Sequence, residues 1–324
     1  MLYNLLDVQN EQLDDHAMNN FTISDISRAL SELGMAHEIF GESDRRYSFK
    51  SLRNIEPGGI YFITPGVLNP PRVPNSIIIG ADKYEADVSI VVDDPQLAFY
   101  QLMRSLLPPP AAPKGVHPTA IVDEASIIHA DASVGPYCVL EGCEIKSGVR
   151  LHSHVVVMAG SIIEEDVTVE AHSTIGSTSV AWVWDQSSRR RIMQPQVGFV
   201  RIGKGSFLGT GVAVGRGSVN EWTSLGANSV VAQGSKIGHG SVIGEGCHLS
   251  PNVSLAGNVT LGDRCFIGTG AVIRSQTRLA EGTIVGAGAT VVRNVTELNL
   301  MLVGSPAVEK DQPETMAGVP KTLK

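Results

Sequence analysis

Large aromatic side chains are scarce in this sequence. Phe, Trp and Tyr together make up 5% of the 324 residues, whereas glycine occurs 34 times. This balance disfavours a globular core built on large rings and favours a regular structure with thin, repetitive packing. The chain is long enough for two domains and a sizeable core.

Long apolar runs and an excess of positive charge are also lacking. No uninterrupted apolar stretch is long enough to cross a bilayer, so we expect no membrane span. The N-terminal MLYNLLDVQNEQLDD has no positive segment followed by an apolar run, which predicts no secretion signal. The formal net charge of -8 disfavours nucleic acid or an anionic membrane as a partner, because like charges repel. The four cysteines form no CxxC pair, which favours a reduced, cytoplasmic setting.

An aliphatic residue returns at every sixth position in the last third of the chain. A similar run occurs earlier with only Ser133 out of type, and a short third run loses one residue around 220–224 before it resumes. The positions are Ile237, Ile243, Leu249, Leu255, Leu261, Ile267, Ile273, Leu279, Val285 and Val291; Ile121, Ile127, Val139, Ile145, Leu151, Val157, Ile163, Val169 and Ile175; and Ile202, Leu208, Val214 and Leu225.

A period of six predicts a mainly β fold, a parallel β-helix of hexapeptide repeats with the aliphatic side chains inside a narrow prism. A β-sandwich is the alternative. The fifth position of each hexad is small or β-branched, and here Cys247 and Cys265 stack one coil apart. We expect these two cysteines to be buried core residues and not a redox pair.

The repeat divides the chain into segments. Residues 1–107 lack it and predict a small α/β domain, in which 24–34 and 94–107 are capped helices and GGIYFI, SIIIGA and VSIVVDD are strands. The proline-rich residues 108–115 form a linker. Residues 116–302 form the β-helix, from which 181–201 protrudes as a loop, and 303–324 form a short tail.

Several motifs resemble known enzymes. GVHPTAIVD (115–123), DPQLAFYQL (94–102) and PQVGFVRIG (195–203) are similar to the β-helix start, last N-terminal helix and loop end of the UDP-3-O-acylglucosamine N-acyltransferases. Residues 239–273 and the closing VGSPA resemble the sialic-acid and bacillosamine-type amino-sugar acetyltransferases instead. The chain is thereby identified as a member of the left-handed β-helix acyltransferase superfamily, between two branches. The left hand and a homotrimer with clefts between subunits are implied by this resemblance.

The resemblance implies catalytic and donor-binding residues on the predicted β-helix. His239 follows Ile237-Gly238 in a turn and corresponds to the catalytic histidine of both branches; imidazole suits a general base that takes a proton from an attacking amine. His248 corresponds to a histidine at the thioester end of the donor. Gly257, one coil above His239, would leave room for a pantetheine arm and offer its N–H to an oxyanion. Ala287 and Gly288 match further donor contacts.

Other residues are candidates for the acceptor. Phe62 matches an aromatic residue that stacks on uracil in the lipid A enzyme, but Leu68 stands where that enzyme has a tyrosine. Trp184 and Arg189–Arg191 lie in the loop, where the arginines either clamp phosphates of a nucleotide sugar or CoA, or form a solvated face.

A carboxylate is expected to orient His239. Glu221 lies near it one coil below and is also a candidate substrate contact, with Glu245 as the rival. His154 and His172 stack one coil apart beside His152 without a coherent third ligand, so we expect no metal and no permanently bound cofactor.

The leading interpretation is an N-acyltransferase of surface-glycan synthesis, which moves an acetyl or short acyl group from acyl-CoA to the amino group of a nucleotide-linked amino sugar. The alternative is the UDP-3-O-(3-hydroxyacyl)glucosamine N-acyltransferase of lipid A synthesis, fed by acyl carrier protein. A metal hydratase of the carbonic-anhydrase type and a non-catalytic scaffold are interpretations from other classes.

Overall fold

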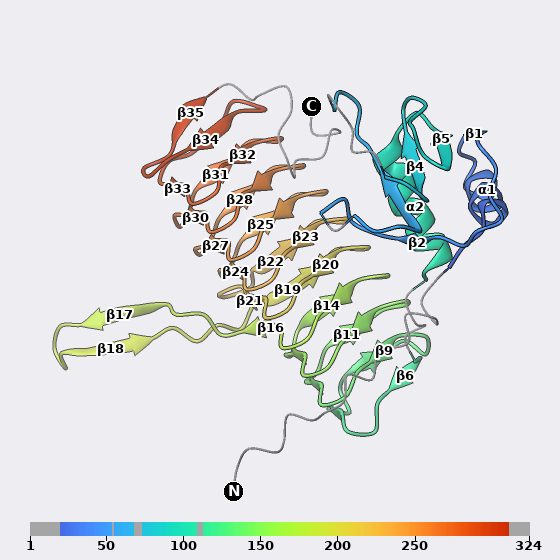
Figure 1. The fold of residues 1–324 in the computed structure, drawn as a ribbon. Helices are drawn as coiled ribbons and strands as arrows, with labels where there is room; N and C mark the ends of the chain where they lie inside the picture. Colours follow the sequence, from blue (N-terminus) through green and yellow to red (C-terminus); the bar gives the residue numbers. More distant parts are fainter. Residues whose placement is uncertain (1–19, 54, 68–72, 109–112, 311–324) are drawn as a thin grey trace, which may run out of the picture. The chain divides into compact units, whose positions relative to one another are not determined.

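The computed structural model describes residues 20–53, 55–67, 73–108 and 113–310. It divides the chain into two compact units, Met1–Ala111 and Ala112–Lys324 (Figure 1). Leu68, the N-terminal residues 1–19 and the tail beyond 310 lie outside the described residues. No helix in the part that the structure describes is both long and apolar enough for a bilayer.

The N-terminal unit is a sheet of five described strands with two helices. The strand order is β1-β5-β4-β3-β2, in which β1 runs antiparallel to β5 and the other pairs are parallel. The three predicted strands are present as β3, β4 and β5, and the short strands β1 and β2 were not predicted. The strands are β1 (Glu38–Phe40), β2 (Ser48–Phe49), β3 (Gly59–Phe62), β4 (Ile77–Gly80) and β5 (Val88–Val91).

Both predicted helices are present. Helix α1 (Ile23–Glu32) begins two residues earlier than a serine cap at Ser24 predicts, because Thr22 and Asp25 form a reciprocal capping box at its N-terminus and Ser24 lies inside the helix. Helix α2 (Pro95–Leu106) starts after Asp94, whose carboxylate accepts a hydrogen bond from the Leu97 N–H. Ile26 and Leu30 of α1 and Leu102 of α2 are buried in one apolar core with the sheet.

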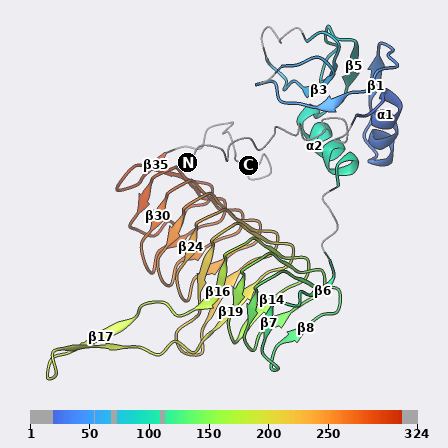
Figure 2. The same cartoon turned by 60° about the horizontal axis from the view of Figure 1, so that its bottom comes forward.

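The C-terminal unit is the predicted left-handed parallel β-helix. Strands of successive coils stack into three sheets that form the sides of a prism (Figures 1 and 2). Tight turns between the sheets use positive φ angles, as at Asn252 and Asn258, where a short polar side chain tolerates the left-handed region.

The sheets contain nine, eight and eleven strands within the described residues. The nine-stranded sheet holds β7 (Ile121–Val122), β10 (Val139–Leu140), β13 (Val156–Val157), β16 (Thr174–Ser177), β21 (Ala213–Gly215), β24 (Lys236–Ile237), β27 (Ser254–Leu255), β30 (Val272–Ile273) and β33 (Thr290–Val291). The eight-stranded sheet holds β8 (Ile127–Ile128), β11 (Glu144–Ile145), β14 (Ser161–Ile163), β19 (Phe199–Ile202), β22 (Trp222–Leu225), β25 (Val242–Ile243), β28 (Thr260–Leu261) and β31 (Arg278–Leu279). The eleven-stranded sheet holds β6 (Gly115–Val116), β9 (Ser133–Val134), β12 (Arg150–Leu151), β15 (Thr168–Val169), β20 (Phe207–Leu208), β23 (Val230–Val231), β26 (His248–Leu249), β29 (Phe266–Ile267), β32 (Ile284–Val285), β34 (Met301–Val303) and β35 (Val308–Lys310).

The predicted inward positions are buried from Ile145 onward. All ten aliphatic residues from Ile237 to Val291 are at most 3% exposed. The first two hexads differ, because Ile121 and Ile127 are each 68% exposed and their neighbours Val122 and Ile128 pack against the core. The register shifts by one residue between the buried Leu140 and Ile145.

The predicted protruding loop contains a β-hairpin, called here the arm. Strands β17 (Trp182–Asp185) and β18 (Arg190–Met193) pair antiparallel and extend away from the β-helix body (Figures 1 and 2). The protruding segment ends earlier than predicted, because Phe199–Ile202 is already strand β19, with Val200 buried. At the other end of the unit, β35 from the predicted tail pairs antiparallel with β34.

Candidate active site

His239, the arm and the loop 216–221 lie at one corner of the β-helix. The arm connects β16 to β19, and residues 216–221 connect β21 to β22. The His239-Gly240 turn connects β24 to β25, and Gly257 lies between β27 and β28. Since these strands pair in register from coil to coil, the connections stack along the corner between the nine- and eight-stranded sheets.

Two hydrogen bonds hold the turn that carries His239. The Gly240 N–H donates to the hydroxyl of the buried Thr223 at 2.8 Å, and the Asn258 N–H donates to the His239 carbonyl at 2.7 Å. The turn is therefore tied to the coil below and to the coil above. A half-buried imidazole is presented from a fixed backbone.

The two ring nitrogens of His239 have different surroundings. Nδ1 lies 3.4 Å from the Ser218 hydroxyl. Nε2 lies over Gly257, where a Cβ atom would sit 2.4 Å from it. The Gly257 N–H itself donates to no acceptor among the described residues. An unbonded ring nitrogen and an unbonded backbone donor thus lie side by side.

The residue that contacts His239 is a serine and not the expected carboxylate. Within the described residues, neither Glu221 nor Glu245 bonds the imidazole. The Glu221 carboxylate instead accepts from the Ser218 N–H at 3.3 Å, so Ser218 stands between the two. The hexad pattern gave no signal for Ser218, because it lies in the irregular loop 216–221.

The space at Gly257 is not empty, contrary to the expectation that it leaves room for a pantetheine arm. The His239 ring occupies the volume that a side chain at 257 would take. The absence of a Cβ atom therefore admits the imidazole of the same chain, and a donor would have to approach beside it.

The other predicted donor contacts lie elsewhere on the prism. His248 begins β26 in the eleven-stranded sheet and stacks on Phe266 of the next coil, with centroids 5.0 Å apart and planes at 9°. Partial burial lowers the pKa of His248, since a low-dielectric surrounding disfavours the imidazolium ion. Ala287 and Gly288 are exposed in the turn between β32 and β33, at another corner from His239.

The arm holds Trp184 and the three arginines away from His239. Trp182, Trp184 and Arg191 share one face of the hairpin, and the Arg191 guanidinium lies 4.8 Å from the Trp182 ring centroid. Arg189 adopts a positive φ in the turn, and Arg190 pairs in register with Asp185. Within one chain these residues do not join the His239 cluster (Figures 1 and 2).

Phe62 lines a pocket of about 590 Å³ in the N-terminal unit. Its ring lies 4.9 Å from that of Phe99 and 6.0 Å from that of Tyr100, which is 56% exposed. Arg53 also lines the pocket. Helix α2 thus supplies the exposed ring of Tyr100 beside the half-buried Phe62, whereas Leu68, which stands where the lipid A enzyme has a tyrosine, lies outside the described residues.

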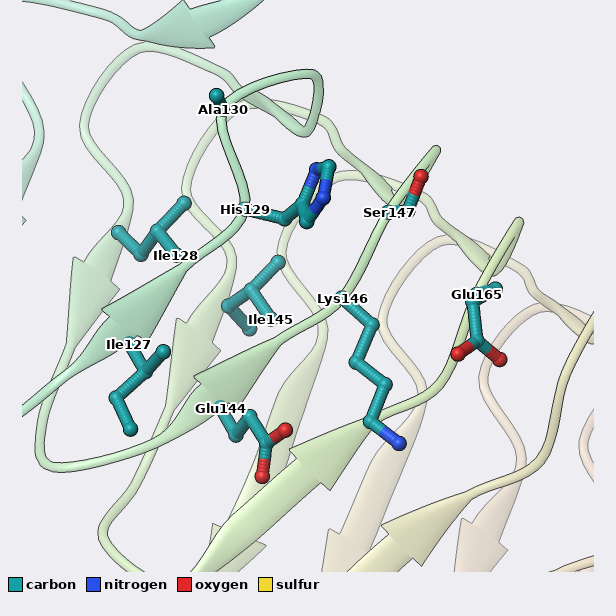
Figure 3. Close-up of a pocket in the computed structure, with 9 residues that line it drawn as sticks. All are labelled: Ile127, Ile128, His129, Ala130, Glu144, Ile145, Lys146, Ser147 and Glu165. Carbon is teal, nitrogen blue, oxygen red and sulfur yellow. The ribbon is translucent and has the colours of Figure 1, made fainter.

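A hollow near the first coils of the β-helix offers little chemistry. Figure 3 shows its lining, in which Glu144 projects from β11, Lys146 follows that strand and His129 follows β8. Two of the charged side chains are paired, since Lys146 contacts Glu164 at 2.6 Å and His129 contacts Asp131. His239 is not part of this hollow.

Two histidines stack on each other in successive coils. His154 and His172 lie ring on ring with centroids 4.7 Å apart, both in turns with positive φ. No group of three His, Cys, Asp or Glu side chains in the described ranges has the spacing of a metal site. Cys247 and Cys265 are buried as predicted, and each thiol donates to a backbone carbonyl of the next coil.

Comparison with known proteins places the fold among bacterial transferases. The family model "Bacterial transferase hexapeptide (six repeats)" matches residues 240–275 and 258–293. The UDP-3-O-acylglucosamine N-acyltransferase of Bordetella pertussis is 26% identical over 66% of this chain and 64% of its own length. That of Pseudomonas entomophila is 25% identical over 45% of this chain and 47% of its own length. This chain therefore spans less than two thirds of these relatives.

A solved structure agrees with the β-helix. LpxA from Acinetobacter baumannii matches with a TM-score of 0.55 and 25% identity, over 60% of this chain and 73% of that one.

Proposed function

We propose that this chain transfers an acyl group from a thioester to the amino group of a UDP-linked glucosamine derivative. The chain belongs to the left-handed β-helix superfamily of hexapeptide-repeat acyltransferases. The observation that carries the proposal is the His239 geometry. Nε2 has no hydrogen-bond partner among the described residues and lies beside the unbonded Gly257 N–H.

The chemistry follows from these two groups. The amine nitrogen attacks the thioester carbonyl carbon while His239 Nε2 accepts the proton that the nitrogen loses. The carbonyl oxygen becomes an oxyanion, which the Gly257 N–H stabilises by a hydrogen bond. Collapse of this intermediate forms the amide and expels the thiolate, which takes the proton from the imidazolium. No covalent enzyme intermediate is needed, and most of the acceleration comes from holding amine and thioester together.

Ser218 positions the base in this scheme. A hydroxyl at 3.4 Å from Nδ1 favours a ring orientation in which Nε2 faces the reactants. The Glu221 carboxylate, which holds the Ser218 backbone, also lies where it can attract an acceptor that arrives as an ammonium ion.

The donor is the point on which the two branches of the resemblance differ. The sequence favours acyl-CoA, whereas the relatives named for N-acylation of UDP-3-O-acylglucosamine support the lipid A alternative. We therefore place acylation by an acyl carrier protein first and a CoA thioester second. The pocket of Phe62 and Tyr100 supports a uracil ring on the acceptor, because both rings offer stacking surface.

The test measures thiol release with hydroxyacyl carrier protein and with acetyl-CoA, in parallel, on UDP-3-O-acylglucosamine and other UDP-amino sugars. We expect turnover with the carrier protein, and a loss of about 10²–10⁴-fold in His239→Ala without a change in melting temperature. Near-normal turnover of His239→Ala would remove His239 from the mechanism. Turnover with acetyl-CoA alone would restore the first interpretation of the sequence.

A further inference from the structure

Two stacked aromatic side chains lie on the outer face of the eight-stranded sheet. Phe199 begins β19 and Trp222 begins β22; their ring centroids are 4.9 Å apart and their planes are inclined by 30°. Phe199 is 36% exposed and Trp222 is 39% exposed, while the next residues along each strand, Val200 and Thr223, are buried. The rings therefore form a partly exposed apolar surface outside the core.

The strand register places this surface one coil below the His239-Gly240 turn. Strands β22 and β25 pair Ser224 with Val242 and Leu225 with Ile243. Two residues farther back, Trp222 corresponds to Gly240, and Glu221 corresponds to His239. One coil separates corresponding positions, about 4.8 Å at the usual strand spacing.

The aromatic residues occur where the corner is enlarged. In five of the other coils, the position of Trp222 is taken by a residue with positive φ, namely Gly142, Gly160, Gly240, Asn258 or Gln276. In the two coils that carry the arm and the loop 216–221, the position holds Phe199 and Trp222. The insertions and the aromatic rings thus change the same corner in adjacent coils.

Trp222 has neighbours of different kinds on its two sides. Phe199 and Arg201 both come from β19 below, and the Arg201 guanidinium lies 5.1 Å from the Trp222 ring centroid. In the coil above, Gly240 has no side chain. The Glu221 carboxylate reaches this level, since its Oε2 lies 3.4 Å from where a Cβ atom of Gly240 would be.

We propose that Trp222, supported by Phe199 and Arg201, binds the C–H face of the acceptor's pyranose ring, while Glu221 accepts a hydrogen bond from the sugar. This inference rests on the proposed function and names the acceptor subsite of that same site. A hexopyranose offers an apolar face of C–H groups that packs on an aromatic ring by dispersion. Its hydroxyl and amino groups remain at the rim, where a carboxylate and an imidazole are within reach.

The short distance to His239 selects the sugar over the nucleobase. Acyl transfer requires the amino group beside Nε2, and the ring that carries this amine is the part of the acceptor nearest to the His239 turn. A base joined through ribose and a diphosphate lies much farther from the amine than one coil. The pocket of Phe62 and Tyr100 remains the candidate site for the base.

A binding experiment tests the proposal without relying on catalysis. The full chain contains three tryptophans, so the double variant Trp182→Phe/Trp184→Phe leaves Trp222 as the single fluorophore. Titration with UDP-N-acetylglucosamine should change its emission, whereas UDP at the same concentration should not. An equal response to UDP alone, or no response to either, would overturn the proposal. Because no turnover is needed, this result is independent of whether the chain transfers acyl groups.

Kinetics on the otherwise unchanged chain provide the second measurement. Trp222→Leu should raise KM for the UDP-amino sugar about tenfold and leave KM for the acyl donor unchanged, and Trp222→Phe should retain most of the affinity. Phe207→Leu is the matched control, since Phe207 is also 39% exposed but lies in the eleven-stranded sheet. An unchanged acceptor KM in Trp222→Leu would overturn the proposal. The proposal would also be overturned if Trp222→Leu weakened the oligomer and a higher protein concentration restored both the oligomer and the KM for the acceptor.

Discussion

Glycine serves two different purposes in the turns of this β-helix, and Gly257 and Gly270 represent them. Gly257 is not in the left-handed region, but a Cβ atom there would lie 2.4 Å from His239 Nε2. Gly270 has a φ of +69° and nothing within 4 Å of a Cβ atom. One glycine makes room for the imidazole, and the other satisfies the backbone.

The two substitutions to alanine should therefore have opposite effects. Gly257→Ala should displace the imidazole and reduce turnover by at least about tenfold, with little change in melting temperature. Gly270→Ala should leave turnover unchanged and cost about 1 kcal/mol of stability, because a side chain is strained at positive φ. Turnover and thermal unfolding of both variants give the answer. Full activity of Gly257→Ala would mean that the contact with His239 is not needed.

The lowered pKa of His248 predicts how stability depends on pH. The unfolded chain takes up a proton at this histidine near pH 6.5, whereas the folded chain does so only at a lower pH. Acidification from pH 7 through 6.5 should therefore favour unfolding. His248→Phe preserves an aromatic partner for Phe266 and should reduce this pH dependence in urea unfolding curves. A variant with the same pH dependence as the wild type would assign the effect to other groups.

At the scale of elements, the hexad predicted the core of the β-helix from its period alone. It failed where two aliphatic residues stand together, because Ile121-Val122 and Ile127-Ile128 fit either register equally well. The structure buries the second residue of each pair, and the register changes before Ile145. Ser133, which does not fit the predicted pattern, indicates this shift, since Val134 is the residue that belongs to the hydrophobic core there.

The candidate site was predictable only in the parts that belong to the repeat. His239 and Gly257 lie in regular turns, so the period placed them one coil apart. Ser218 and Trp222 belong to the connection and strand where a coil is enlarged, and no repeat position predicts their direction. Tyr100 comes from a helix, and only the packing of α2 on the sheet brings it beside Phe62.

The arm is the element whose charge can be tested. Its three arginines are exposed, and cations on an acidic protein attract phosphates with a strength that salt reduces. Replacing Arg189, Arg190 and Arg191 with alanine should raise KM for the UDP-amino sugar or the donor and reduce the salt dependence of that KM. The matched control replaces Arg150, Arg274 and Arg278, which carry the same charge outside the arm. Equal KM values in both triple variants would mean that the arm arginines are solvent-exposed residues that do not bind the phosphates.

At the scale of the whole molecule, one chain does not bring all the predicted residues together. His239 lies at the corner between the nine- and eight-stranded sheets, and Ala287 at the corner between the eleven- and nine-stranded sheets. In a cyclic homotrimer, one corner of each copy faces a different corner of the next, so residues that are apart in one chain can share a cleft. The exposed Val183, Ile192 and Met193 of the arm also favour contact with another copy, because an isolated hairpin is marginally stable in water.

Mixed oligomers test whether each site combines two copies. His239→Ala lacks the proposed base, and Ala287→Trp should block the predicted donor path with a bulky side chain on an exposed turn, so each variant alone should be inactive. In trimers mixed at equal ratio, about one quarter of the sites should combine an intact His239 with an intact Ala287 from the neighbouring copy. We therefore expect turnover to recover to about one quarter of the wild-type value after co-expression. Ala287→Ser is the control and should retain activity. Recovery would follow from a donor that spans two copies, because no chain in the mixture carries both intact residues. An inactive mixture that still forms trimers would place both residues in a site of one chain.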